Sequence, residues 1–330
     1  MMPTTKPVLI PKTVNIKNQL MVSALFANRP KQNNMTKKGI LVKAISGFYY
    51  VACDGNVYEC KARGNFRKAG VSPVVGDIVE FSLTDDTHGI VEQIATRKNL
   101  FNRPLVANID KMFIVSAYMT PAPDTLMIDR LTALAIYNNI EPIIVFNKSD
   151  MGSFDEYYQI YVNTGFKTYV VSAKERIGID SLRDEMNNCV CAFSGNSGVG
   201  KSSLLNSLFP ELQLKTGEVS DKLGRGRHTT RHTELFFVGN GAYVVDTPGF
   251  STVETNEDLY NFKLSLADCF PEFDEYLGNC KFNSCSHTCE KGCAVIDALK
   301  NGKIQKSRHD SYVALANELK DVTAWNTKQK

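Results

Sequence analysis

Two rhythms of apolar and polar residues divide the chain. From Gly39 to about Arg97, apolar and polar residues alternate in short runs, rich in β-branched and aromatic residues, that turns such as Asp54-Gly55 separate. This alternation is typical of half-buried strands joined by tight turns. About five short antiparallel strands suit a small barrel. The pattern therefore predicts an OB-fold domain over residues 37–100.

The predicted barrel carries basic residues around one aromatic residue, Phe66. These basic residues are Lys61, Arg63, Arg67 and Lys68. Basic side chains around an exposed ring suit single-stranded RNA, because the charges attract the backbone while the ring stacks on a base. A solvated hairpin with Phe66 in the core would give the same pattern, so both interpretations stay open.

Beyond the barrel, apolar strands alternate with helical patterns. Residues 124–138, for example, have apolar positions at helical spacing. Alternating strands and helices predict a mostly parallel sheet covered by helices, with ligands beyond the carboxyl ends of the strands. We expect one α/β domain over residues 101–252. The predicted strands lie in KMFIVSA (111–117), EPIIVFNKSD (141–150), TYVVSAK (168–174), CVCAFS (189–194), TELFFVG (233–239) and GAYVVDTPG (241–249).

The two ends of the chain differ from this pattern. Residues 1–36 show no sustained period and are predicted to be a disordered extension, in which Met35 is an alternative start. Residues 253–330 combine a Cys/His cluster with helical patterns, which indicates a mainly helical zinc-binding domain. The whole fold class expected is therefore multidomain.

Composition narrows the class of protein. The 330 residues are 43% hydrophobic and 22% charged, and the net charge of +3 is too small to indicate a polyanionic partner by itself. No apolar run approaches the length of a membrane span. Four of the nine cysteines lie between Cys280 and Cys293 beside a histidine, which favours a metal over disulfides. We therefore expect a reduced, cytoplasmic protein, with a monomer as the default state.

The stretch GNSGVGKSS matches the P-loop pattern and lies between an apolar strand and a predicted helix. Its glycines let backbone N–H groups wrap a β-phosphate, and the helix adds its positive end. Lys201 is expected to reach the β- and γ-phosphates, and Ser202 to bind Mg²⁺. The candidate residues are Gly195, Asn196, Ser197, Gly198, Val199, Gly200, Lys201, Ser202 and Ser203.

A base-reading motif, Asn147-Lys148-Ser149-Asp150, ends an earlier strand. Asp150 can accept the N1 and N2 hydrogens of guanine, a pair that adenine lacks, so the motif indicates GTP rather than ATP. Lys148 would lie along the base, and Asn147 would tie this loop to the P-loop. About twenty residues later, the backbone of a second loop would close over the guanine O6; its residues are Ser172, Ala173 and Lys174.

The stretch Asp246-Thr247-Pro248-Gly249 follows another strand. Asp246 would hold Mg²⁺ through water, and the Gly249 N–H would contact the γ-phosphate. Where Ras-type enzymes place a water-orienting glutamine, this chain has Phe250, whose ring cannot orient water. We therefore expect slow intrinsic hydrolysis and a catalytic polar group from elsewhere.

A candidate source of that group is LGRGRHTTRHTE (223–234), whose glycines and basic residues suit a switch segment. Thr229 or Thr230 would reach the metal, and His228 would orient the water. A solvated surface histidine is the alternative for His228.

The C-terminal array Cys-x4-Cys-x-His-x5-Cys comprises Cys280, Cys285, His287 and Cys293. Three thiolates and one imidazole form a closed tetrahedral set that suits one structural Zn²⁺. Cys289 is a fifth possible ligand, so spacing alone leaves the choice open.

The motifs follow the order base reader, base-closing loop, P-loop, switch and Asp-x-x-Gly, which is the usual GTPase order rotated. Joining old termini and opening new ones can preserve a pocket. In this order the segment that senses the γ-phosphate leads directly into the Cys/His domain, so loss of phosphate would be able to move that domain.

The rotated order and the stretches GNSGVGKSSLLN, LGRGRHTTRH, DTPGFS and CKFNSCSHTCEKGCAV resemble the bacterial ribosome small-subunit-dependent GTPase A (RsgA/YjeQ) family. The resemblance runs from about Lys38 to the early 320s. It implies a late maturation factor that binds the small ribosomal subunit and its rRNA with GTP and leaves after ribosome-stimulated hydrolysis. It also implies zinc on Cys280, Cys285, His287 and Cys293 rather than Cys289, and a catalytic role for His228.

Two other functions remain alternatives. Phe250 is compatible with an RNA-binding assembly scaffold that rarely cleaves its nucleotide. Asp150 argues against an ATP-dependent enzyme.

Overall fold

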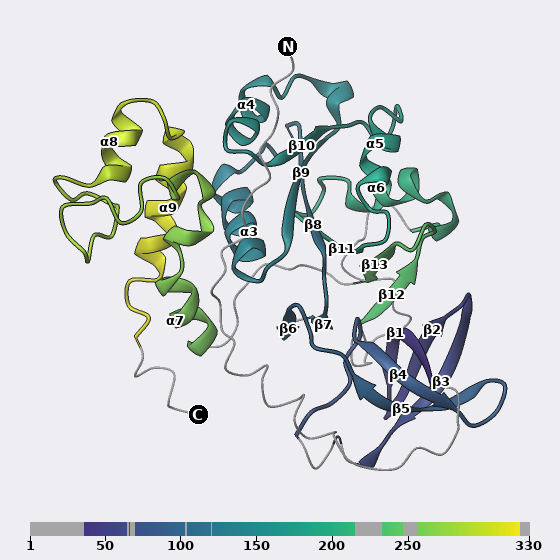
Figure 1. Ribbon diagram of the computed structural model, residues 1–330. Helices are drawn as coiled ribbons and strands as arrows, with labels where there is room; N and C mark the ends of the chain where they lie inside the picture. Colours follow the sequence, from purple (N-terminus) through teal and green to yellow (C-terminus); the bar gives the residue numbers. More distant parts are fainter. Residues whose placement is uncertain are drawn as a thin grey trace.

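The computed structural model describes residues 36–64, 66, 70–102, 104–119, 121–214, 233–246 and 256–323. Its elements form a small barrel, a central sheet with helices, and a helical C-terminal part that lies beside the sheet (Figure 1). No helix in these ranges is both long enough and apolar enough to cross a bilayer.

The barrel contains the predicted strands in an order that closes on itself. β1 pairs with both β2 and β4, and the strands follow the order β1-β2-β3-β5-β4, in which β3 and β5 are parallel. This arrangement is the five-stranded barrel that the alternating pattern predicted, but the β3–β5 pair is parallel where antiparallel pairing was expected. The strands are β1 (Thr36–Ile45), β2 (Phe48–Cys53), β3 (Asn56–Ala62), β4 (Ile78–Leu83) and β5 (His88–Ile94).

Phe66 lies in the barrel core, where its exposed fraction is 3%. The core interpretation is therefore correct, and Phe66 as an exposed stacking ring is wrong. Alternation along a strand does not say which face is covered. The ammonium of Lys61 instead lies 5.3 Å from the ring centroid of Phe48. Arg63 pairs with Glu92 at 2.6 Å, and Arg67 and Lys68 lie outside the described residues.

The central sheet continues in the order β10-β9-β8-β11-β13-β12. Its first five strands are parallel, and β12 forms an antiparallel hairpin with β13. The predicted strand positions are confirmed. The strands are β8 (Lys111–Ala117), β9 (Glu141–Asn147), β10 (Lys167–Val170), β11 (Val190–Ser194), β12 (Glu234–Phe237) and β13 (Tyr243–Asp246).

Helices cover both faces of this sheet. Alternate residues of one strand divide between the two faces: Met112 packs in the core beneath α3 and α4, and Phe113 in the core beneath α5 and α6. This alternation explains the continuously apolar strands, because both of their faces are buried. The helices are α3 (Thr125–Tyr137), α4 (Asp155–Asn163), α5 (Ile179–Asp184) and α6 (Lys201–Leu208).

The barrel and the central sheet are joined through strands distant in sequence. β1 pairs with β12 at Lys43 and Glu234, whose side chains form an ion pair at 2.8 Å. A register shift in β1 between Leu41 and Lys43 lies at this point. A short hairpin of β6 (Leu100–Asn102) and β7 (Leu105–Ala107) also lies between the two parts (Figure 1). The sequence pattern did not indicate the pairing of β1 with β12.

The C-terminal part packs against the outer side of α3. Ala133 of α3 belongs to its core, together with residues such as Phe262 and Leu315. α3 is therefore buried between the sheet and this part, which explains its apolar residues on nearly all sides. The elements are α7 (Asn256–Leu264), η4 (Ala267–Cys269), η5 (Pro271–Phe273), α8 (Ala294–Lys300) and α9 (Lys306–Glu318).

A buried arginine, Arg308 of α9, holds this interface. Its Nη1 lies 2.7 Å from Asp129 of α3, and its Nε and Nη2 donate to Glu272 at 2.7 and 3.1 Å. Its side chain and that of Asp129 are fully buried. The guanidinium also lies 4.6 Å from the ring centroid of Phe270. This geometry ties the C-terminal part to α3 through a charged contact that requires one relative orientation.

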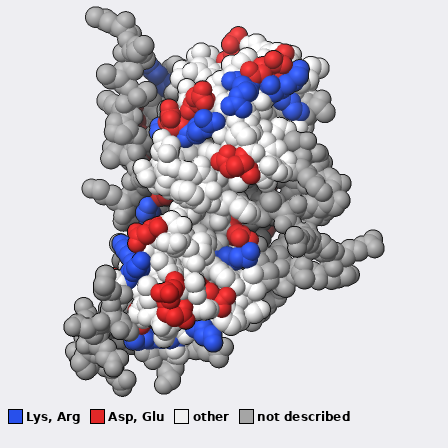
Figure 2. Space-filling view, turned by 90° about the vertical axis from the view of Figure 1, so that its right-hand side faces the viewer, with Lys and Arg blue, Asp and Glu red and all other residues white. Residues whose placement is uncertain are grey.

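Charge is mixed on the molecular face drawn in Figure 2. Its described basic and acidic side chains lie close together, and neither sign forms a continuous surface there. This distribution agrees with the net charge of +3.

Candidate functional site

The P-loop connects β11 to α6, and its backbone requires glycine. At Gly195, φ is 138°, and a Cβ would lie 2.1 Å from the Val115 carbonyl oxygen. At Gly200, φ is 90°, and a Cβ would lie 2.6 Å from Asn147 Nδ2. Any side chain at either position would displace a neighbouring strand or loop. The other predicted P-loop residues are all described between β11 and the first turn of α6: Asn196, Ser197, Gly198, Val199, Lys201, Ser202 and Ser203.

Asn147 brings three distant loops together. Its Nδ2 donates to the Val199 carbonyl at 3.0 Å, and its Oδ1 accepts the Ala173 N–H at 3.1 Å. Its exposed fraction is 1%. Lys148 donates from Nζ to the Gly198 carbonyl at 2.8 Å. The base-reading, base-closing and P-loop segments therefore meet at the carboxyl ends of β9, β10 and β11.

The Asp150 carboxylate is held beside these three loops. Ser172 donates from its hydroxyl to Asp150 Oδ1 at 2.6 Å and accepts the Glu175 N–H at 3.1 Å. The hydrogen bond from Ser172 lowers the pKa of Asp150. Asp150 is therefore ionised at neutral pH and can accept two hydrogens. Ser149 N–H donates to the Val171 carbonyl at 3.1 Å, and Lys174 Nζ lies 4.0 Å from Asp150.

Lys201 points back into the P-loop. Its ammonium donates to the carbonyls of Gly195 and Asn196 at 2.6 and 2.8 Å. Burial lowers the pKa of this lysine. An ammonium held by carbonyls in the middle of a phosphate-binding loop can exchange them for phosphate oxygens.

The other residues predicted to contact the nucleotide lie wholly or partly outside the described part of the chain. His228, Thr229, Thr230 and Gly249 lie outside the described residues. For Asp246, only the backbone at the end of β13 is described, where it pairs with Glu234.

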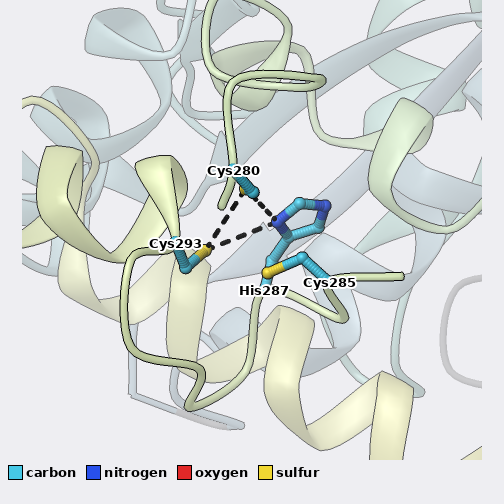
Figure 3. A group of neighbouring side chains, drawn as sticks. All are labelled: Cys280, Cys285, His287 and Cys293. Atoms are coloured by element: carbon cyan, nitrogen blue, oxygen red, sulfur yellow. Dashed lines mark hydrogen bonds between the residues drawn. The ribbon is translucent and has the colours of Figure 1, made fainter. Parts of the chain in front are cut away.

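The metal-binding motif forms a compact group in the C-terminal part (Figure 3). One ligand atom from each of Cys280, Cys285, His287 and Cys293 lies within 4.8 Å of the others. His287 Nδ1 lies 3.5 Å from the sulfurs of Cys280 and Cys293, which are 3.8 Å apart. Tetrahedral bonds of about 2.0–2.3 Å would place such atoms about 3.5–3.8 Å apart. The group therefore fits a tetrahedral metal ion.

Burial shifts the protonation of the histidine and of one cysteine in opposite senses for metal binding. Burial lowers the pKa of His287, which favours the neutral imidazole that binds metals. Burial raises the pKa of the Cys285 thiol to about 12, so a cation must displace its proton. Cys289 is exposed and is not part of the converging group. None of the nine cysteines, all of which are described, forms a disulfide.

Two sets of contacts around these loops were missed by sequence reasoning. Around the metal group, Glu290 accepts hydrogen bonds from the segment that carries His287. Two side chains of α9 donate hydrogen bonds to backbone carbonyls of the same segment. Near the P-loop, Asn206 of α6 binds both backbone groups of Leu214 at 2.6 and 2.7 Å. A glutamate within the Cys/His array and an asparagine in a helix are too common to signal these roles.

Two family models match the chain. The model described as RsgA GTPase matches residues 93–256, and that described as RsgA N-terminal domain matches residues 38–91.

Full-length relatives show the same similarity. The protein named "Small ribosomal subunit biogenesis GTPase RsgA" from Geobacillus sp. (strain WCH70) is 42% identical over 290 residues, covering 86% of this chain and 98% of that protein. The protein of the same name from Halalkalibacterium halodurans is 42% identical over 290 residues, covering 86% and 97%.

Two solved structures are similar in fold. The crystal structure of YjeQ from Thermotoga maritima gives a TM-score of 0.74 at 33% identity and covers 87% of this chain and 99% of that one. The structure of YloQ, described as a circularly permuted GTPase, gives 0.72 at 32% identity, with coverages of 90% and 99%.

Proposed function

Because the chain belongs to the RsgA GTPase family, we propose that it hydrolyses GTP in the biogenesis of the small ribosomal subunit. The observation that carries this proposal is the position of Asn147, which contacts the P-loop and the base-closing loop at once. Three loops that are shuffled in the chain can therefore hold one nucleotide.

Guanine recognition is assigned to Asp150 and the loop that follows β10. The Asp150 carboxylate would accept the N1 and N2 hydrogens of guanine. Within the loop, the Ser172 N–H donates to the Ile177 carbonyl and the Ala173 N–H to Asn147. We therefore assign the Lys174 N–H as the donor to the guanine O6.

The phosphates would lie over the first turn of α6. Lys201 would leave the carbonyls of its own loop for the β- and γ-phosphate oxygens. Ser202 and Asp246 are the residues that would hold Mg²⁺, which supplies charge neutralisation at the phosphates. Gly249 would donate its N–H to the γ-phosphate.

Hydrolysis requires a water aligned with the γ-phosphorus. Because the ring of Phe250 can neither donate to nor accept from this water, we assign its orientation to His228. The transition state places charge on the phosphate oxygens, so positioning by Lys201 and Gly249 supplies much of the expected catalysis.

The metal group would hold one structural Zn²⁺ per chain, with three thiolates and one imidazole and no open position. Its role would be to stabilise the C-terminal part.

We further propose a cytoplasmic monomer whose barrel and C-terminal part contact the small subunit and its rRNA. The exposed Lys61, whose ammonium lies over the half-buried ring of Phe48, supports contact with RNA, whereas the buried Phe66 does not.

The test is GTP turnover by the full, metal-loaded chain with and without purified small ribosomal subunits. We expect slow turnover alone and at least about tenfold stimulation by the subunits, with Lys201→Ala inactive in both conditions. Binding to subunits without stimulated turnover would instead favour the assembly scaffold, which Phe250 keeps as a second candidate.

A further inference from the structure

The segment that presents His287 is organised by one carboxylate. Glu290 Oε1 accepts the Ser286 N–H at 2.6 Å and also the Ser286 hydroxyl. Glu290 Oε2 accepts the N–H groups of Thr288 and Cys289 at 3.0 and 3.1 Å. Both carboxylate oxygens are therefore engaged by the backbone on either side of the metal ligand.

This support matters because His287 has a strained backbone. Its φ is 58°, in the left-handed region that non-glycine residues seldom adopt. Such a conformation persists only where the surroundings enforce it. Since this conformation aims Nδ1 at the sulfurs of Cys280 and Cys293, the contacts that enforce it also set the ligand geometry (Figure 3).

Helix α9 holds the same segment by donating hydrogen bonds to the segment's backbone carbonyls. His309 donates from Nε2 to the His287 carbonyl at 2.9 Å, and the Tyr312 hydroxyl donates to the Ser286 carbonyl at 2.8 Å. Both side chains are buried, with exposed fractions of 5% and 4%. Three N–H groups of the segment, those of Ser286, Thr288 and Cys289, therefore donate to Glu290, and two of its carbonyls accept from α9.

We propose that Glu290 is a positioning residue for the metal site: its carboxylate holds the turn that presents His287 and thereby sets metal affinity, without itself binding the ion. This inference rests on the metal site proposed above. The converging group already offers four ligand atoms, which is the number a closed tetrahedral site takes. Contacts of this kind usually change metal affinity by about 10- to 100-fold.

The experiment is a Co²⁺ titration of the metal-free full chain, followed by competition with Zn²⁺. The Co²⁺ absorption reports both the amount bound and the ligand set. For Glu290→Gln, we expect binding about 10- to 100-fold weaker than for the unmodified chain, with an unchanged thiolate-to-cobalt spectrum at saturation. Glu275→Gln, the same change at an exposed glutamate of the same part, should bind like the unmodified chain.

A second variant guards against misfolding. Tyr312→Phe removes only the hydrogen bond to the Ser286 carbonyl and should weaken binding about fivefold. Unchanged affinity in Glu290→Gln would overturn the inference, whatever the result for Tyr312→Phe, while leaving the metal site standing. A changed spectrum in Glu290→Gln at saturation would overturn it differently, because Glu290 would then be a ligand. Failure of the unmodified chain to bind one ion would overturn the metal site and this inference together.

Discussion

In the P-loop, the lysine that would bind phosphate contacts its own loop, whereas in the metal group the ligand atoms of Cys280, His287 and Cys293 already lie at coordination spacing. Lys201 donates to the Gly195 and Asn196 carbonyls, so nucleotide binding must exchange contacts. Around His287, the backbone is fixed by Glu290 and α9, so an ion would add bonds and break few. One site is built to change with its ligand, and the other to keep its shape.

The two sites also differ in how far apart their residues lie in the sequence. The cleft draws on residues from Asn147 to Lys201, carried by three different strands of the sheet. The metal ligands come from one stretch between Cys280 and Cys293. A site made from separate loops can respond to movement of any of them, which suits a switch, whereas a site within one stretch suits a structural role.

Loss of the metal should give the largest effect and test the structural role. Cys293→Ser removes a buried ligand and should leave less than about one tenth of an ion per chain, with a marked fall in the melting temperature. GTP affinity should change less than about twofold, because the cleft shares no residue with the metal group. The matched control, Cys289→Ser, should retain the ion; its loss there would place Cys289 among the ligands.

The buried charged contact between α3 and the C-terminal part should be nearly as important for stability. Arg308→Met leaves Asp129 and Glu272 buried without their cation and should cost about 3–5 kcal/mol in urea unfolding. Arg130→Met removes a more exposed ion pair with Glu318 across the same helices and should cost at most about 1 kcal/mol. Equal costs for the two variants would contradict a buried charged interface.

A change in the cleft should affect the nucleotide and spare the metal. Lys201→Ala should lower GTP affinity on the order of a hundredfold, since charge-assisted bonds to phosphate are lost. Titration with a fluorescent GTP analogue measures this, and metal analysis should still find one ion per chain. Lys300→Ala, at an exposed lysine of α8, should bind GTP normally.

The smallest effect concerns the support of Asp150. Ser172→Ala removes the hydroxyl that lowers the Asp150 pKa and should reduce the preference for GTP over ATP about three- to tenfold. Because the pKa of Asp150 lies below the usual aspartate range, its ionised form persists through neutral and mildly acidic pH and is lost only in strong acid. The preference of the unmodified chain should therefore be constant between about pH 5 and 8. A loss of preference on acidification within that range would contradict the assignment.

The sequence predicted those features whose residues are close together in the chain. Gly195 to Ser202 and Cys280 to Cys293 carry their spacing with them, and the strand pattern placed the first of these stretches correctly between a strand and a helix. The pairing of Lys43 with Glu234 could not be predicted, because it depends on how two finished parts meet. The same holds for Arg308, which reads as an ordinary charged residue of a helix and is fully buried in the structure.

Phe66 illustrates a further limit. An aromatic residue among basic ones has the same pattern whether it faces solvent or the core, and only the packed barrel decides. Glu290 is harder still, because its role comes from backbone N–H groups that no side-chain motif records.

Asp150→Asn is the sharpest test of whether these shuffled loops together read one guanosine triphosphate. An asparagine amide can donate to the 2-oxo group of xanthine where the carboxylate accepted from the 2-amino group of guanine. Competition of GTP, XTP and ATP for the full chain should therefore show GTP preferred by the unmodified chain and XTP preferred by Asp150→Asn, with the second Lys201→Ala change weakening both. An Asp150→Asn variant that still prefers GTP would show that Asp150 does not read the guanine base.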